Sequence, residues 1–206
     1  MPRISKDPQE RKDEILNAAM ELFNSKGYEQ TSVSDIVRKV GVAQGTFYYY
    51  FQSKEEIIHA ACERNLASRL EKVKQLVAST ERNALEKLTR LLMDAYPSDQ
   101  EAAVLDYLHQ ESNSTLHQKW IVAEITALLP YARQIVRQGV AEGTFRVQQP
   151  ELAAEFLLVG ASFWYDRGIF AWNDEEYAEK RQALAGIIDR LLIGGGPAPA
   201  SDASTQ

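Results

Sequence analysis

The chain has 206 residues, of which 45% are hydrophobic and 25% are charged, proportions that are ordinary for a soluble globular protein with enough material for a core. Its one cysteine excludes an intramolecular disulfide, no apolar run reaches the ~18 residues that span a bilayer, and no signal-peptide core follows the N-terminus, so we expect a cytoplasmic protein. The net charge is −6, but residues 1–54 hold eight Lys/Arg against seven Asp/Glu, so the acidity belongs to the rest of the chain.

The first predicted helix follows a charged N-terminal arm, residues 1–6, which we interpret as disordered. Asp7 can cap this helix, Pro8 suits its first position, and Glu10 would complete a capping box. An apolar stripe with helical spacing continues until Gly27, a residue type that commonly ends helices. We expect this helix to be a scaffold for the segment that comes next.

A second apolar stripe with helical spacing runs through residues 33–40 and stops at Gly41, which can adopt the positive φ of a tight turn. A short helix is predicted next over residues 43–51, with Phe47 and Phe51 one turn apart on its inward side. Two short helices joined by such a turn predict a helix-turn-helix.

The outward side of the second short helix carries amide, hydroxyl and phenol groups but no charge, at Gln44, Gly45, Thr46, Tyr48 and Tyr49. These groups suit the major groove of DNA, since glutamine pairs with adenine, threonine contacts thymine and glycine lets the backbone approach. Tyrosine hydroxyls can reach phosphate oxygens. The alternative is that the tyrosines are packing aromatics.

Lys54 lies in the first turn of the following helix, where the helix dipole disfavours a cation. Ser53 and Glu56 have the spacing of a capping box, which fixes the start of that helix. A lysine at this place is explained if a phosphate group binds there, where free backbone amides also point. The alternative is an ordinary solvated surface charge.

Residues 10–57 resemble the N-terminal domain of TetR-family transcriptional regulators in the segments AAMELFNSKGYEQTSVSDIV, VGVAQGTFYYYF and SKEE. The resemblance implies a three-helix DNA-binding domain, a helical C-terminal domain that dimerises, and usually a small-molecule effector. Tyr50 departs from the histidine that the family often has at this position. The small positive charge of the N-terminal region indicates that affinity comes from two such domains on one DNA site.

Matched position by position, the resemblance assigns DNA contacts to eight residues of this chain. Those at the start of the second helix and on the following helix are expected to contact phosphates and bases, and the lysine a phosphate. They are Thr31, Ser32, Gln44, Gly45, Thr46, Tyr48, Tyr49 and Lys54.

The rest of the chain also has helical periodicity, so we expect an all-α protein. We divide it into a helix-turn-helix domain over residues 1–54, an effector-binding and dimerisation domain over 55–193, and a disordered tail over 194–206. Pro130 is expected to bend one helix, and residues 111–115 to form a loop. The further helices are predicted at about 53–77, 81–95, 98–110, 116–140, 152–170 and 173–193.

The last two predicted helices are more apolar than one neighbour can cover. Small residues at 160–162 would allow close approach of another helix. We expect these helices to meet their symmetry mates in a four-helix dimer interface. The alternative is that they only wrap the core of the monomer.

We find no catalytic constellation, no metal-ligand spacing and no phosphate-binding glycine loop, and we expect no cofactor and no enzymatic activity. The histidines His59, His109 and His117 are scattered and are interpreted as surface residues. An effector cavity lined by aromatic side chains with a few polar groups is expected in the second domain. Its candidate residues are Met93, Tyr96, Tyr107, Trp120, Glu124, Tyr131, Phe163, Trp164 and Arg167.

The predicted function is that of a DNA-binding regulator, a dimeric repressor that occupies a palindromic operator and is released by a small apolar or aromatic effector. A regulator without an effector and an activator are the first alternatives. A helical enzyme or ligand-transport module with an incidental helix-turn-helix is a third.

Overall fold

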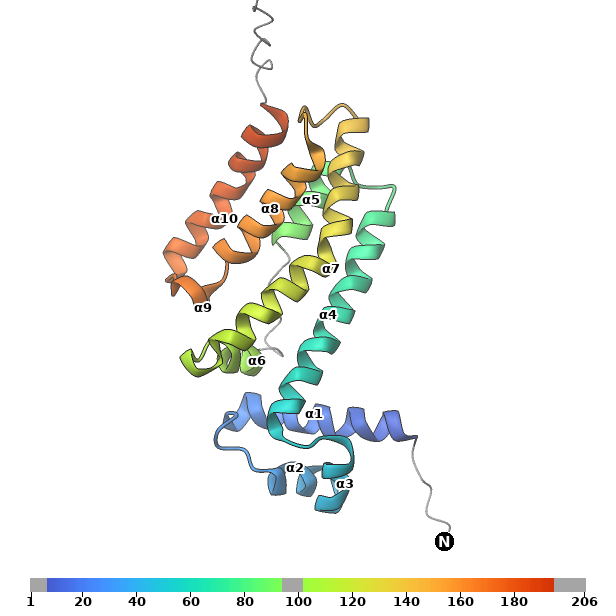
Figure 1. Ribbon diagram of the computed structural model, residues 1–206, viewed down its shortest axis with the longest axis vertical. Coiled ribbons are helices and arrows are strands. Elements are labelled where there is room, and N and C mark those ends of the chain that lie inside the picture. Colours follow the sequence, from blue (N-terminus) through green and yellow to red (C-terminus); the bar gives the residue numbers. More distant parts are fainter. Residues whose placement is uncertain (1–6, 94–101, 195–206) are drawn as a thin grey trace, which may run out of the picture. The chain divides into compact units, whose positions relative to one another are not determined.

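The computed structural model describes residues 7–93 and 102–194, and in these ranges every regular element is helical, as predicted (Figure 1). The helices are α1 (Pro8–Lys26), α2 (Val33–Val40), α3 (Gln44–Tyr50), α4 (Lys54–Ala78), α5 (Ala84–Met93), α6 (Ala102–Leu108), η2 (Glu111–Asn113), α7 (Ser114–Ala141), α8 (Pro150–Trp164), α9 (Arg167–Phe170), α10 (Asp174–Ile188) and η3 (Asp189–Ile193). The predicted N-terminal arm, the stop at Tyr96 with its following cap, and the tail beyond residue 194 lie outside the described residues.

The described chain forms two compact units. The N-terminal unit comprises residues 7–71 and 102–122, and the C-terminal unit comprises residues 72–93 and 123–194. Helix α6 and the first turns of α7 therefore belong to the same compact unit as α1, α2 and α3, although the chain passes through the other unit in between. The domain border that we predict after residue 54 marks the end of the helix-turn-helix, whereas the compact unit extends beyond it.

Local signals explain where the first two helices begin and end. The Asp7 side chain caps α1 by accepting a hydrogen bond from the Gln9 amide at 2.8 Å, rather than forming the predicted box with Glu10. Ser32 caps α2 within a true capping box. Gly41 ends α2 with a φ of 76°, a conformation that L side chains adopt only with strain. The predicted turn is confirmed.

The N-terminal unit has one continuous hydrophobic core to which α1, α3, α4 and α6 all contribute. Phe47 of α3 is completely buried and Phe51 nearly so, as the sequence predicts. Burying large apolar side chains of this kind is the main stabilising term in a small domain. The principal members of this core are Ile15, Leu16, Phe23, Ile36, Phe47, Phe51, Ile57, Ile58, Val104, Tyr107 and Leu108.

In the C-terminal unit, a buried lysine joins three helices. The Lys87 ammonium group of α5 donates hydrogen bonds to the Val77 carbonyl at 2.8 Å and to the Gln138 side chain at 2.9 Å. A cation at the C-terminal end of α4 is favoured by the helix dipole. Nearby, Phe145 packs so closely on Gly139 that a Cβ atom at that glycine would collide with the ring.

Two sequence-based boundaries are wrong. The predicted helix over 152–170 breaks after Trp164, because the Asp166 side chain accepts hydrogen bonds from the amides of Gly168 and Ile169 and starts α9 as a separate turn. The predicted loop over 111–115 is instead the 3-10 turn η2 followed at once by α7. Pro130 does lie inside α7, and the bend that we expect there stays a prediction.

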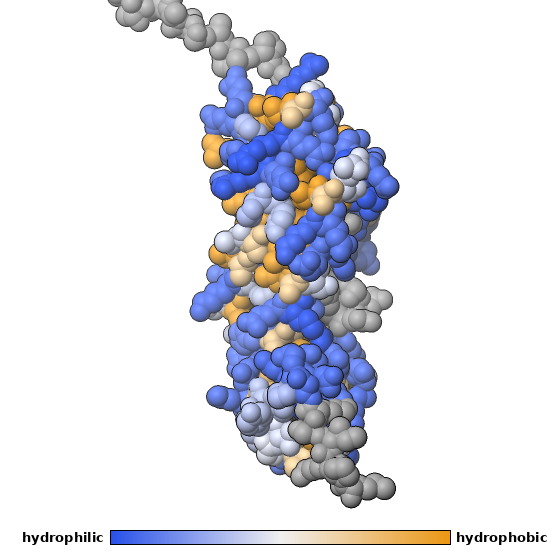
Figure 2. All heavy atoms as spheres, turned by 90° about the vertical axis from the view of Figure 1, so that its right-hand side faces the viewer, coloured by the Kyte–Doolittle hydropathy of each residue, from blue (hydrophilic) through white to orange (hydrophobic). Residues whose placement is uncertain are grey.

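Hydrophobic residues are exposed between hydrophilic ones along the face drawn in Figure 2. Among residues 7–93 and 102–194, no helix is both long enough and apolar enough to cross a membrane.

Candidate nucleic-acid interface

Helix α3 exposes a surface of uncharged polar groups. Gln44, Gly45, Tyr48 and Tyr49 are exposed, with 78% of Tyr49 accessible to solvent, while Thr46 is half-buried. A Cβ atom at Gly45 would contact nothing within 4 Å, so the backbone can be approached closely there. Exposed tyrosines side by side on a short helix are unusual unless a partner covers them.

The inward side of α3 holds these groups in place. The Phe47 ring meets the Tyr48 ring edge-on at 5.4 Å and lies 6.1 Å from the Phe51 ring. The Tyr49 ring likewise meets the Tyr50 ring edge-on at 4.9 Å. Because the buried rings fix the helix, the exposed phenols are presented in a defined orientation.

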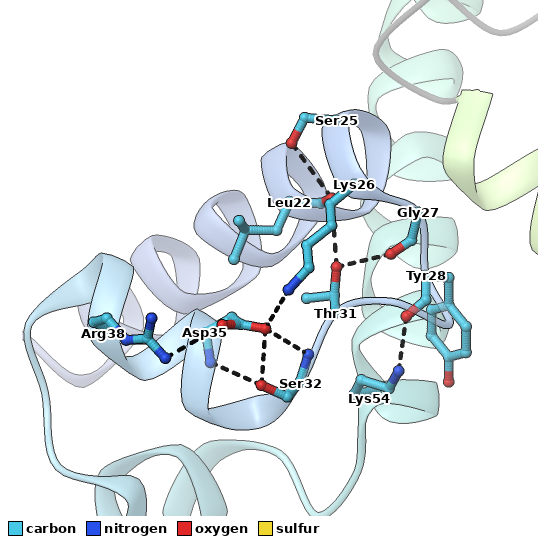
Figure 3. Close-up of polar contacts among 10 residues, drawn as sticks. All are labelled: Leu22, Ser25, Lys26, Gly27, Tyr28, Thr31, Ser32, Asp35, Arg38 and Lys54. Atoms are coloured by element: carbon cyan, nitrogen blue, oxygen red, sulfur yellow. Dashed lines mark hydrogen bonds and ion pairs between the residues drawn. The ribbon is translucent and has the colours of Figure 1, made fainter.

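The two predicted phosphate-contacting residues at the start of α2 differ in their exposure to solvent. Ser32 is exposed at the N-cap, as a phosphate contact would require. Thr31 is only 1% exposed, and its hydroxyl donates a hydrogen bond to the Gly27 carbonyl at 2.8 Å (Figure 3). The phosphate contact expected of Thr31 stays a prediction, and in this structure its hydroxyl holds the loop before α2.

Asp35 fastens α2 to α1 through a cluster of charged and polar contacts (Figure 3). Its carboxylate accepts hydrogen bonds from Lys26 at 2.6 Å, from the Ser32 amide at 3.1 Å and hydroxyl at 2.8 Å, and from Arg38 at 3.3 Å. The hydrogen bond from Lys26, followed by those from Ser32, holds the pKa of the Asp35 carboxyl well below its usual range. The start of α2 is therefore fixed on α1 by a cluster that includes Ser32, one of the predicted phosphate contacts.

We expect Asp35→Asn to lower the Tm at pH 7, and its difference from the wild type to shrink between about pH 4 and pH 2. A carboxyl whose pKa is lowered by folding stabilises the protein fully above its unfolded pKa, which is about 4, and this contribution is lost as the pH falls toward the folded value. Thermal unfolding followed by circular dichroism measures it, with Asp106→Asn as an exposed control. A difference that stays constant down to about pH 2 would contradict the assignment.

Lys54 is half-buried at the start of α4, and its ammonium group has a partner within the protein. It donates a hydrogen bond to the Tyr28 carbonyl at 2.7 Å and lies 4.3 Å from the centre of the Tyr28 ring (Figure 3). Ser53 accepts from the Glu56 amide at 3.2 Å, and the Glu56 carboxylate accepts from the Gln52 amide at 2.6 Å, one residue before the predicted box. An ammonium group has three N–H donors, so two remain for a phosphate.

Comparison with known protein families matches two parts of the chain, one of which contains the helix-turn-helix. Residues 15–61 match the family described as "Bacterial regulatory proteins, tetR family", and residues 99–187 match the family described as "Tetracyclin repressor-like, C-terminal domain". The chain belongs to the TetR family. This TetR-family protein is a DNA-binding transcriptional regulator, which confirms the coarse function predicted from the sequence.

Curated relatives cover most of this TetR-family chain. It is 27% identical over 188 residues to the fatty acid metabolism regulator protein of Bacillus subtilis, covering 88% of this chain and 93% of that protein. It is 28% identical over 149 residues to the transcriptional repressor KstR2 of Mycolicibacterium smegmatis, covering 70% and 72%.

Solved structures show the same fold. A transcriptional regulator from Cytophaga hutchinsonii superposes with a TM-score of 0.71 at 19% identity, over 87% of this chain and 97% of that one. A regulator from Saccharomonospora viridis, solved in complex with choline, superposes with a TM-score of 0.63 at 21% identity, over 90% and 98%.

The predicted effector residues of this TetR-family chain fall into both compact units. Tyr107 is buried in the core of the N-terminal unit, Trp120 packs against the same core, and Tyr96 lies outside the described residues. In the C-terminal unit Arg167 is already engaged, since it pairs with Asp174 at 2.9 Å and lies 4.2 Å from the centre of the Tyr177 ring. The half-buried candidates of the C-terminal unit are Met93, Glu124, Tyr131, Phe163, Trp164 and Arg167.

Two features of the interface in this TetR-family protein are not among the predictions from its sequence. The capping box of Ser32 with Asp35 follows the S-x-x-D pattern, which is a local signal that the sequence does contain. The contact of Lys54 with Tyr28 joins residues far apart in the chain and has no local signal.

Proposed function

We propose that this regulator is a repressor that binds a palindromic operator as a homodimer in the cytoplasm and is released when a small apolar or aromatic effector binds its C-terminal domain. The observation that carries the DNA-reading part is the outward face of α3, where Gln44, Tyr48 and Tyr49 are exposed without any charged neighbour on that helix. Repression is supported by the relatives named KstR2, which are transcriptional repressors.

Dimerisation is supported by an exposed apolar stripe on α8. Leu152, Phe156 and Val159 follow one another at helical spacing and remain 56%, 70% and 43% exposed. A Cβ at Gly160, beside this stripe, would meet no atom within 4 Å beyond its chain neighbours and the nearby backbone of its own helix, so a second helix can approach. Leu191, in the last described turn of the chain, is also 43% exposed. A second copy would remove this apolar surface from water.

An effector is supported by the relatives and by the side chains of the C-terminal unit. One relative is named as a regulator of fatty acid metabolism, and one structural neighbour contains choline. Phe163, Trp164 and Tyr131 are half-buried, which leaves part of each side chain available to a ligand. Release from DNA requires that the effector bind the DNA-incompetent state more tightly than the DNA-competent one.

Selecting bound fragments from a pool of random duplexes tests the proposal directly. We expect an inverted repeat to be enriched, because each protomer of a symmetric dimer reads one half-site. A monomeric protein that prefers no duplex over bulk competitor at moderate ionic strength would contradict it. The same result would favour the helical enzyme or transport module.

Adding apolar and aromatic compounds, fatty acids among them, to the protein and its selected duplex then tests the effector. A compound that binds the folded protein should raise its Tm and lower its affinity for the duplex. A regulator without an effector would show no shift with any compound, and an activator would keep its DNA affinity when the compound binds.

A further inference from the structure

We propose that Tyr107, a residue of α6, positions Lys54 for its phosphate contact by holding Tyr28 beneath the lysine ammonium group. This inference rests on the proposed role of Lys54 at the DNA backbone and adds two positioning residues, Tyr28 and Tyr107, that lie outside the DNA-contacting set. All three residues belong to the N-terminal unit.

Tyr28 fixes the lysine through both its backbone and its ring. The Tyr28 carbonyl accepts the Lys54 hydrogen bond at 2.7 Å, and the ring centre lies 4.3 Å from the same nitrogen. Figure 3 shows the ammonium group beside the Tyr28 ring and carbonyl. A lysine side chain otherwise samples many rotamers, and this freedom is reduced when the side chain is ordered on binding. Holding the lysine beforehand removes part of that entropic cost from the phosphate contact.

Tyr28 is in turn held by residues of two helices. Its ring meets the Phe23 ring of α1 edge-on at 5.0 Å and lies 4.4 Å from the Tyr107 ring of α6. The Tyr28 and Tyr107 side chains also share a hydrogen bond. Tyr28 itself lies in the loop between α1 and α2, where its carbonyl also accepts a hydrogen bond from the Thr31 amide at 3.2 Å. The ring contacts add to these backbone bonds by fixing the orientation of the Tyr28 side chain.

Helix α6 is firmly seated on α1, which makes Tyr107 a fixed support. Tyr107 is 7% exposed, and Val104 and Leu108 of the same helix are buried in the shared core. At the start of α6, the Ala103 amide donates a hydrogen bond to the Asn24 side chain at 3.0 Å. A displacement of α6 would therefore shift the Tyr28 ring, and with it the Lys54 ammonium group.

The pair of tyrosines supports the lysine without neutralising it. Burial raises the pKa of both Tyr28 and Tyr107, so both phenols are neutral at the pH of DNA binding. Elsewhere in the helix-turn-helix, Lys26 pairs with Asp35 at 2.6 Å and Lys39 pairs with Glu21 at 2.8 Å. Lys54 makes no ion pair with a carboxylate of the described residues, so no such pair has to break before it binds a phosphate.

A double-mutant cycle tests whether Tyr107 acts through Lys54. Duplex affinity is measured at several salt concentrations for the wild type, Tyr107→Leu, Lys54→Ala and the double variant, using the full chain and its selected operator. We expect Tyr107→Leu to weaken duplex binding several-fold. It should also make the slope of log affinity against log salt concentration less steep, as Lys54→Ala does, by up to about 0.9 for each phosphate that the protein no longer neutralises. In the Lys54→Ala background it should have no further effect.

Two controls separate positioning from stability. Tyr107→Phe keeps the ring contact with Tyr28 and should recover most of the affinity, whereas Ile15→Val thins the same core on α1 and should leave the salt slope unchanged. An equal loss from Tyr107→Leu with and without Lys54 would overturn the inference, as would an unchanged salt slope. If the Lys54→Ala protein bound the operator with the affinity and the sequence selectivity of the wild type, the inference would also be overturned, but the proposed function as a DNA-binding regulator would stand.

Discussion

Phe156→Arg is expected to convert the regulator into a monomer and to weaken operator binding by about 100-fold or more. Two linked heads on one operator bind far more tightly than one, because the second contact forms at a high effective concentration. Phe156 lies at the centre of the exposed stripe of α8 and is 70% exposed. An arginine there would bring two charges face to face across a symmetric interface and leave both poorly solvated.

The monomer itself should tolerate this change, since a side chain so exposed contributes little to its own core. Gly160→Glu offers an independent variant, because a Cβ at that position would meet no atom within 4 Å beyond its chain neighbours and the nearby backbone of α8, and glycine is a weak helix former. Val122→Arg, at a position 58% exposed on α7, is the matched control for placing an arginine on an apolar surface position.

Size-exclusion chromatography with light scattering gives the oligomeric state, and fluorescence anisotropy with the selected duplex gives the affinity. We expect the two α8 variants to be monomeric and to bind the duplex weakly, and the α7 control to remain dimeric with the affinity of the wild type. A Phe156→Arg protein that remains dimeric with unchanged affinity would show that the subunits meet elsewhere.

Much of the N-terminal unit is predictable from the sequence because its end signals are local. Gly41 ends α2 with a positive φ, and Phe47 and Phe51 are buried one turn apart, as their spacing indicates. These features depend on residues within a few positions of one another. For the same reason the serine before Lys54 correctly predicts where α4 begins.

Prediction fails where a long-range or competing local interaction decides. Apolar periodicity continues through residues 152–170, but the Asp166 carboxylate offers the next amides a cap and ends the helix. The Thr31 hydroxyl binds the Gly27 carbonyl, an internal contact that the residue type alone does not reveal. Tyr107 has the composition of a pocket residue, but aromatic composition does not reveal which core a ring joins.

Lys54→Ala and Gln44→Ala are expected to impair DNA binding in different ways. Removing the lysine should weaken binding by about tenfold on every duplex and reduce the salt dependence, because it takes away a charge-assisted contact to the sequence-independent backbone. Removing the exposed glutamine at the start of α3 should leave binding to unrelated duplexes unchanged. The binding free-energy difference between the operator and a variant at the base pair that Gln44 contacts should fall by ~1–3 kcal/mol.

The distinction follows from where the two side chains are held. Lys54 is anchored on Tyr28 at the edge of the domain, with donors left over, and its target is a charge that every duplex carries. Gln44 stands at the first position of α3, the helix whose exposed groups carry no charge, so it can discriminate between bases only by hydrogen-bond geometry. Anisotropy titrations against the operator, single-base variants and a scrambled duplex at two salt concentrations separate the cases. If both variants weakened binding equally on all three kinds of duplex, α3 would be a backbone-binding helix, and the sequence would have to be read elsewhere on the protein.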